Sequence, residues 1–263
     1  MTSPDPDAVA ALPRHLQLLW GLEPEGRRGP RPSRTIEDIG AAAAAIADID
    51  GIAAVSMKRV AQALGLTTMS LYRYLDSKAD LLAVMSDVAA GAPTVRFGPR
   101  WGWRRRLQSW AVGIADVRRA HPWMADVQTG GPPITPNLVS WMELGIRSFE
   151  STPLSYQERF SALLMVDSFV SGHVRTTVQT GLSAPDEPAP RGASEAPKQG
   201  PSYLDLLALV LDPARFPALT RGAPEALGDD EDEDFFATEL HFGLAIVLDG
   251  VAALIERSQP QAR

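Results

Sequence analysis

The feature that most constrains this chain is the stretch of residues 55–82, VSMKRVAQALGLTTMSLYRYLDSKADLL. Ser56 is placed to cap a short helix, Gly65 ends that helix, and Thr67 or Thr68 caps a second one. Two short helices joined by a three- or four-residue turn that contains glycine form the helix-turn-helix pattern. The stretch therefore predicts two packed helices in this arrangement.

The second of these helices has the side chains that a DNA-reading helix needs. Such a helix packs one apolar side on its partner helix and leaves its N-terminal half free for the major groove. Leu66, Leu71 and Leu75 supply the packed side. Hydroxyl groups can bond base edges, methionine can contact a thymine methyl group, and tyrosine and lysine suit phosphate oxygens. The candidate DNA-contacting residues are Thr67, Thr68, Met69, Ser70, Tyr72, Arg73, Tyr74 and Lys78. The alternative is a helical hairpin whose tyrosines pack internally and whose charges are only solvated.

The rest of the chain also shows the helical spacing of apolar residues. Thr35 with Asp38, and Ser77 with Asp80, are predicted capping boxes, and Gly51 is a predicted C-terminal stop. Further helices are expected around residues 107–117, 137–149, 155–174, 203–211 and 235–257. We find no strand pattern of comparable quality, so the expected fold is all-α.

Two segments are predicted to lack regular structure. Residues 183–201 are rich in Pro, Ala, Gly and charge, which favours a mobile loop that proteases cut first, at Arg191 or Lys198. Residues 1–32 are expected to form a mostly flexible arm. The basic side chains of this arm, and Arg34 just after it, either enter a DNA minor groove or merely aid solubility. The four residues are Arg27, Arg28, Arg31 and Arg34.

The net charge of −7 is misleading about partners. The acidic run DDEDED, residues 229–234, contributes six negative charges. Between Arg27 and Leu82 there are eight Lys or Arg and six Asp or Glu, a net of +2. The local charge of the predicted head is therefore compatible with a nucleic-acid partner.

Composition excludes several other classes of protein. No run of eighteen apolar residues occurs, so no transmembrane span is expected, and the N-terminus lacks the pattern of a secretory signal. Cysteine is absent, which rules out disulfides, thiolate metal sites and thiol nucleophiles. These features favour a cytoplasmic protein without membrane association.

Catalytic patterns are also missing. The four histidines lack metal-ligand spacing, and we find no nucleophile elbow, phosphate-binding loop or carboxylate pair. We therefore predict no enzymatic activity, no cofactor and no metal site. Large apolar and amphipathic side chains instead cluster in the second half of the chain, where each of them is either core or part of an adaptable ligand pocket. The candidate pocket residues are Trp123, Met124, Val127, Asn137, Trp141, Met142, Met165, Phe169 and His173.

Residues 55–82 resemble the DNA-binding signature of the tetracycline-repressor (TetR) family, through the Gly65 turn, Leu71-Tyr72 and Lys78. The segment HFGLAIVLDGVAALIE, residues 241–256, is similar to the final dimer-forming helix of the tetracycline-repressor branch. HPWM and GPP resemble its regulatory core, so the likeness spans about residues 34–258. It implies an all-α homodimer whose N-terminal three-helix head, residues 33–82, enters the major groove. A C-terminal helical bundle, residues 83–258, would dimerise and bind a small molecule.

Residue by residue, the resemblance adds Lys58 as a DNA-contacting basic position and matches the recognition-helix residues named above. Two departures limit it. The tetracycline repressors hold other residues where this chain has Thr68 and Met69, so their operator sequence does not transfer. Residues 125–129 contain no counterpart of their magnesium-binding histidine, so tetracycline with magnesium is not the expected inducer.

We therefore expect a ligand-responsive one-component transcriptional regulator that binds a near-palindromic double-stranded DNA operator as a homodimer. The expected direction is repression, with release by a small, largely apolar effector through its differential affinity for the two conformations. One alternative is a regulator of the same fold that has no inducer or that activates. Another is a helical binding or enzymatic domain that has lost DNA binding. The sequence does not specify the operator, the effector or the regulated genes.

Overall fold

The computed structural model describes residues 6–22, 34–127, 133–180, 206, 209–221 and 235–259. Within these ranges the chain forms α-helices and short 3-10 helices and no strand, which confirms the all-α prediction. Several predictions fall outside the described residues. They concern the loop at 183–201, the acidic run at 229–234, most of the helix expected at 203–211, and Arg27, Arg28 and Arg31.

The N-terminal head consists of α3 (Ile36–Asp50), η1 (Ile52–Ala54), α4 (Met57–Ala63), α5 (Thr68–Leu71) and the long helix α6 (Lys78–Ala90). Both predicted capping boxes are present, Thr35 with Asp38 and Ser77 with Asp80. Gly51 ends α3 with φ +78°, a conformation that glycine adopts without the steric cost other residues pay. Local capping chemistry therefore sets the boundaries of these helices.

The head has a continuous hydrophobic core, here called the head core. α3 and α6 pack side by side and contribute most of it. Gly40 permits this approach, because a Cβ atom at this position would lie 2.6 Å from Val88 Cγ2 and 3.1 Å from the Val84 carbonyl oxygen. The largest fully buried side chains of the head core are Ile39, Val55, Val60, Leu71, Leu75, Leu81, Val84 and Met85.

The expected flexible arm is partly ordered, so that prediction was wrong for residues 6–22. This segment forms α1 (Pro6–Ala10) and α2 (Arg14–Leu19), and α2 lies against α3 and α6. His15 and Leu16 of α2 are buried, and Leu18 and Leu19 pack against the head core. The apolar run LQLLW therefore docks onto the head, since burying these side chains offsets the entropy of ordering the segment.

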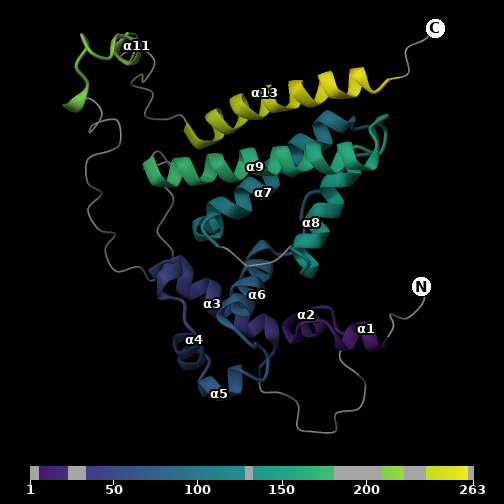
Figure 1. Cartoon of the computed structure of the whole chain (residues 1–263), viewed down its shortest axis with the longest axis vertical. Helices are drawn as coiled ribbons and strands as arrows, with labels where there is room; N and C mark the ends of the chain where they lie inside the picture. Colours follow the sequence, from purple (N-terminus) through teal and green to yellow (C-terminus); the bar gives the residue numbers. More distant parts are fainter. Residues whose placement is uncertain are drawn as a thin grey trace.

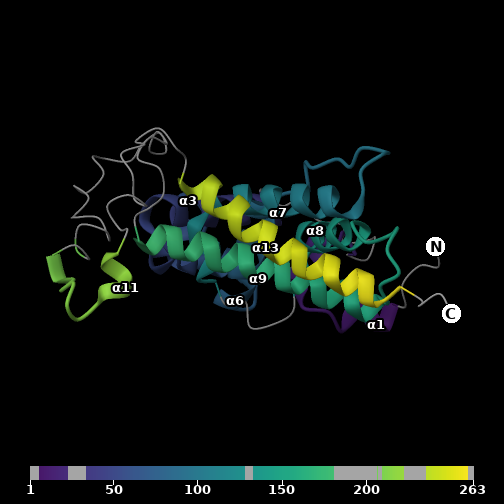
Figure 2. The same cartoon turned by 90° about the horizontal axis from the view of Figure 1, so that it is seen from above.

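The body contains α7 (Trp103–Ala120), η2 (Pro122–Ala125), α8 (Pro136–Arg147), α9 (Tyr156–Thr180) and α13 (Phe235–Arg257). α9 and α13 lie side by side, with α7 and α8 packed beneath them (Figures 1 and 2). The Ser258 hydroxyl contacts Glu158 at 3.2 Å, so the carboxyl end of α13 meets the amino end of α9. The short helix α11 (Pro217–Thr220) is drawn apart from this bundle (Figure 1).

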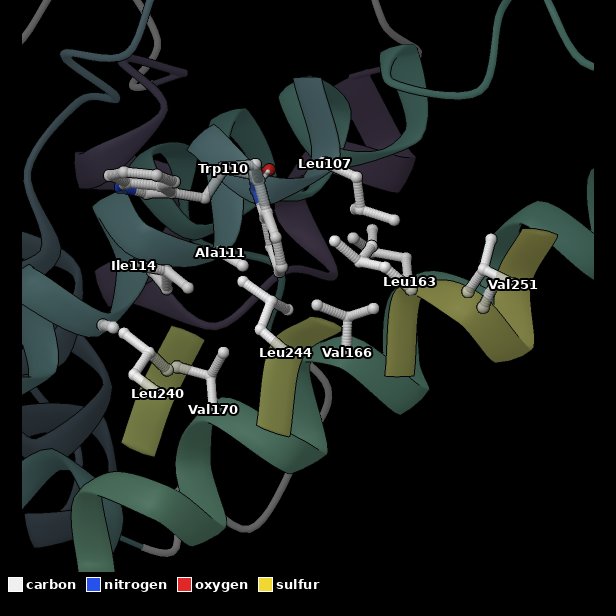
Figure 3. Close-up of a cluster of buried hydrophobic side chains, with 14 of the residues drawn as sticks. Leu107, Trp110, Ala111, Ile114, Leu163, Val166, Val170, Leu240, Leu244 and Val251 are labelled. Carbon is white, nitrogen blue, oxygen red and sulfur yellow. Dashed lines mark hydrogen bonds between the residues drawn. The ribbon is translucent and has the colours of Figure 1, made fainter. Parts of the chain in front are cut away.

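Apolar side chains from α7, α9 and α13 meet in a second cluster, here called the body core (Figure 3). Gly145 of α8 lets Leu163 and Trp110 approach closely, because a Cβ there would lie 2.5 Å from Leu163 Cδ1. The labelled members are Leu107, Trp110, Ala111 and Ile114 of α7, Leu163, Val166 and Val170 of α9, and Leu240, Leu244 and Val251 of α13. α6 joins the two cores, with Val84 and Met85 in the head core and Ala90 in the body core.

α13 is long and apolar enough to cross a membrane by length and composition alone, with a mean hydropathy of 1.6 over its most apolar window. Here it is a bundle helix. Its buried side chains follow helical spacing onto α7 and α9: Phe236, Leu240, Leu244, Leu248, Val251 and Ile255. Only 28% of that window is buried, so the helix also carries an exposed apolar face.

Candidate functional site

α4 and α5 form the predicted helix-turn-helix. The Ser56 side chain accepts from the Arg59 amide and caps α4, and Thr67, not Thr68, caps α5 by accepting from the Ser70 amide at 3.2 Å. Gly65 has φ +68° in the turn between them. The Leu66 amide donates to the Ala61 carbonyl at 2.8 Å and closes the turn. This local chemistry holds the two helices in a fixed relation.

The apolar side of α5 is anchored as predicted. Leu71 and Leu75 are completely buried in the head core, and Leu66 is half-buried against it. These contacts leave the opposite side of the segment at the surface.

That side carries eight of the nine predicted DNA-contacting residues, six of them exposed and two half-buried. Met69 is 76% exposed and Tyr72 is 47% exposed, so both side chains are accessible to a binding partner. We call this set the α4–α5 surface. Its exposed members are Lys58, Thr67, Met69, Tyr72, Arg73 and Lys78, and its half-buried members are Thr68 and Ser70.

Tyr74 does not join the α4–α5 surface, and its predicted outward orientation was wrong. Its side chain lies in the head core with 9% exposure, and its hydroxyl donates to the Arg34 carbonyl at 3.1 Å. The chain turns after α5, so Tyr74 follows Leu71 and Leu75 inward. The internal-tyrosine alternative thus holds for Tyr74 and fails for Tyr72.

Two arginines near this surface have protein partners. Arg34, the described member of the predicted basic arm, is exposed and donates to the Leu64 carbonyl at 3.4 Å. Arg59, which follows Lys58, pairs with Asp50 at the end of α3. These contacts hold both guanidinium groups against the head.

The nine predicted pocket residues are not gathered around one cavity. Trp123 and Val127 pack against the head core, whereas Trp141 lies in the body core and Met142 packs beside it. Met124 touches both cores. Met165 is 62% exposed on α9. Their scatter follows from the fold, because η2 reaches the head while α8 and α9 belong to the body.

Phe169 and His173 do meet. Their rings stack with centroids 6.1 Å apart, and His173 Nε2 lies 3.0 Å from the Phe236 carbonyl oxygen. Burial lowers the pKa of His173, although the bond to Phe236 and the charge of Glu239 oppose this shift. The histidine therefore favours its neutral form inside the bundle.

A groove of about 530 Å³ lies instead along α7 and the start of α13. Arg105 at one side stacks over the Trp101 ring at 4.3 Å, and burial raises the pKa of the Asp116 carboxyl, with Arg119 opposing. The lining combines valines with polar side chains: Thr94, Val95, Arg105, Gln108, Ser109, Val112, Gly113, Asp116, Val117 and His241. Sequence reasoning missed it, since six of its ten lining residues are polar and give no apolar signal.

Polar contacts join the head to the body. The Asp48 carboxylate accepts from the Trp123 indole nitrogen at 2.6 Å and lies 2.8 Å from His121 Nδ1. Asp87 of α6, which is 2% exposed, accepts from the backbone amide of Asn137 at 2.8 Å and thereby caps α8. Asn137 is thus a structural contact between α8 and α6.

No group of three or more His, Asp or Glu side chains suited to a metal ion occurs in the part of the chain that the structure describes.

Comparison with protein families places the two halves of the chain. Residues 37–85 match the family of bacterial regulatory proteins of the tetR type, and residues 98–255 match the tetracyclin repressor-like C-terminal domain. The first match covers the helix-turn-helix, and the second covers α7 to α13.

Individual proteins agree with these matches. The chain is 31% identical over 252 residues to the HTH-type transcriptional repressor DrrR1 of Streptomyces coeruleorubidus, covering 95% of this chain and 89% of the relative. An HTH-type transcriptional repressor of Mycobacterium tuberculosis is 28% identical over 90% of this chain and 87% of its own length. Among solved structures, ActR of Streptomyces coelicolor with bound actinorhodin has 22% identity and a TM-score of 0.64, with coverage of 84% and 98%. A possible TetR family regulator of S. coelicolor has 24% identity and a TM-score of 0.62, with coverage of 83% and 99%. These structures share the fold.

Proposed function

Because this chain belongs to the tetR family of bacterial regulatory proteins, we propose that it is a cytoplasmic transcriptional repressor that binds operator DNA as a homodimer and is released by a small molecule. The observation that carries the proposal is the α4–α5 surface. It places basic, hydroxyl and aromatic side chains at the surface of a segment whose other side is anchored by Leu71 and Leu75. The family is one of transcriptional regulators, and we propose no enzymatic activity for this chain.

We assign the roles on this surface by chemistry. Lys58, Tyr72 and Lys78 would contact phosphates and fix the register of the head. Met69 and the hydroxyls beside it, on Thr68 and Ser70, would face base edges. Arg73, which is exposed at the end of α5, would serve either role.

The exposed apolar face of α9 and α13 supports the dimer. Tyr156, Phe160 and Leu164 are spaced four residues apart on α9 and are exposed by 73%, 38% and 58%. Phe242 and Ile246 repeat the spacing on α13, with 66% and 60% exposure. Exposed large apolar side chains that repeat at helical spacing on two neighbouring helices are typical of an interface. A two-fold dimer presents two identical heads, so the operator is expected to be a near-palindrome.

The groove along α7 is the proposed effector site. Its volume of about 530 Å³ lies in the usual range for small-molecule sites, which is roughly 300–1,000 Å³. Val95, Val112 and Val117 offer apolar contacts, while Arg105 and Asp116 offer charged ones. An amphipathic molecule fits this lining better than the largely apolar one expected from sequence. ActR, which shares the fold, binds actinorhodin in its solved complex, and this supports ligand binding within the same bundle architecture.

The experiment is a titration of labelled DNA from upstream of the protein's own gene and its neighbours, followed by fluorescence anisotropy at several salt concentrations. Lys78→Ala is expected to weaken binding to all operator variants and to reduce the salt slope by about one unit. Thr68→Ala and Arg73→Ala are expected to change preference among single-base operator variants, by about 1–3 kcal/mol at one base pair. Binding that none of these changes affects would show that the α4–α5 surface is not the reader.

Val112→Trp tests the effector site, because the added ring would fill the groove. Compounds that raise the melting temperature of the wild type and release it from operator should do neither with Val112→Trp, while Val112→Trp still binds DNA. Compounds that release both proteins equally would place the effector elsewhere.

A further inference from the structure

The N-terminal helix α2 touches three parts of the molecule that are far apart in sequence. Arg14 donates through Nε to the carbonyl of Arg73, at the end of α5. His15 Nδ1 lies 3.5 Å from the Asp80 carboxylate in the first turn of α6. The Trp20 indole nitrogen, just after α2, donates to the Ile134 carbonyl at 2.9 Å, at the start of α8. One short segment thus contacts the end of the α4–α5 surface, helix α6 and the body.

The contact with Arg73 bears on DNA binding. Arg73 lies in the turn that follows α5, so its carbonyl is outside the hydrogen-bond ladder of that helix and needs another donor. Arg14 supplies a charged donor to this carbonyl, and charge-assisted hydrogen bonds are the stronger kind. Tyr72 and Arg73 belong to this same turn after α5, and their side chains lie on the α4–α5 surface. Arg14 therefore helps to set the direction in which they point.

The contact with Ile134 ties the same segment to the body. Ile134 lies two residues before α8, whose first turn is held by Asp87 of α6. A rotation of the body against the head would have to stretch either the Trp20 bond or the Asp87 bonds. A cavity of about 90 Å³ remains between α2, α6 and the start of α8, lined by His15, Leu16, Ala83, Pro133, Ile134, Thr135 and Leu138. The segment therefore contacts the place where head and body meet through a few polar bonds and a loosely packed interface.

We propose that residues 14–20 act as a strap that fixes the head relative to the body and positions the end of α5 for DNA, with Arg14 and Trp20 as its two anchors. The inference rests on the proposed function for its effect on DNA binding. Arg14 is a positioning residue that acts through the Arg73 backbone. Leu18 and Leu19 still pack against the head core when its two polar anchors are lost, so those substitutions leave the fold intact.

Two substitutions test the anchors. Arg14→Ala removes the bond to Arg73, and Trp20→Phe removes the indole N–H while keeping an aromatic ring. Each is expected to weaken operator binding about tenfold, the effect of losing one hydrogen bond made by a charged or well-placed donor. The double variant should bind operator about as weakly as either single variant, because both anchors hold the same strap. Circular dichroism should show unchanged helix content.

Arg96→Ala is the matched control, since it removes the same charge from an arginine that bonds the nearby carbonyls of Pro93 and Val95. It should leave operator binding unchanged. Salt dependence separates positioning from direct contact, because a lost phosphate contact reduces the salt slope by about one unit. An unchanged slope supports the strap. A reduced slope in Arg14→Ala, with normal binding by Trp20→Phe, would overturn it and make Arg14 a phosphate contact.

Hydrogen exchange measures the strap without DNA. Arg14→Ala should speed amide exchange at residues 72–76, and Trp20→Phe should do so there and at residues 134–138. Equal exchange in wild type and both variants would overturn the strap. A wild type that binds no operator would refute the proposed function, and the exchange rates would still decide the strap.

Discussion

The indole nitrogen of Trp123 donates a hydrogen bond to the carboxylate of Asp48 across 2.6 Å, and this bond joins the body to the head. Trp123 follows α7 in the chain, yet its ring is 6% exposed and lies in the head core. The same carboxylate oxygen is 2.8 Å from His121 Nδ1. Asp48 therefore holds η2 of the body against α3 of the head.

Asp48→Ala should destabilise the protein by about 1–3 kcal/mol, because it leaves a buried indole N–H without its partner. Asp50→Ala is a matched control two residues away. Asp50 pairs with Arg59, both side chains are more than 40% exposed, and such pairs contribute about 0–1 kcal/mol. Urea unfolding followed by circular dichroism measures both. Equal losses for the two variants would contradict the role of Asp48.

The two tyrosines that flank Arg73 should respond oppositely to loss of their hydroxyl. Tyr74→Phe should lower the free energy of unfolding by about 0.5–1.5 kcal/mol, because its bond to the Arg34 carbonyl is lost. Tyr72→Phe should leave stability within about 0.5 kcal/mol and weaken binding to all DNA sequences. Urea unfolding and anisotropy titrations of each variant provide the measurements. A stable Tyr74→Phe together with a destabilised Tyr72→Phe would reverse the assignment.

Ile246→Glu should convert the dimer to a folded monomer. Ile246 is 60% exposed on α13, so a carboxylate there meets water in the monomer and would be desolvated in the interface. Leu248→Glu is the comparison, because Leu248 is 2% exposed in the body core and its replacement should unfold the chain. Light scattering at micromolar concentration and circular dichroism separate the two outcomes. A wild type that is monomeric under these conditions would contradict the proposed dimer.

His173 should make the protein less stable in mild acid. Burial lowers its pKa, so the unfolded chain takes up this proton more readily than the folded chain does. The contribution of the neutral histidine to the free energy of unfolding is fully present above the ordinary histidine pKa of about 6.5. It is lost as the pH falls from there toward the lower pKa that His173 has in the folded chain. Urea unfolding at several pH values between about 5 and 8 should show this loss in the wild type.

His173→Gln should reduce that pH dependence, since the amide can still donate to the Phe236 carbonyl but does not titrate. His241→Gln is the control, because His241 is exposed on α13 and bonds the Ala237 carbonyl of its own helix. The control should retain the wild-type pH profile. The same profile in His173→Gln would assign the acid sensitivity to other groups.

The sequence alone was sufficient for the main helices of the head and body and for the α4–α5 anchor. Thr35, Ser77 and Thr67 each bond an amide three residues ahead, so both partners are visible in a short window. Leu71 and Leu75 follow helical spacing, and both are buried as that spacing predicts. Such features depend on atoms within one or two turns, which is why residue order determines them.

Only the tertiary structure decided where Tyr74, Trp123 and α2 go. Tyr74 bonds a carbonyl forty positions away, Trp123 bonds a carboxylate 75 positions away, and Trp20 bonds a carbonyl 114 positions away. No local spacing encodes these partners, because each forms only after separate helices have packed. The scatter of the predicted pocket residues has the same cause. An apolar side chain must be buried somewhere, and the packing of helices distant in sequence decides against which neighbour.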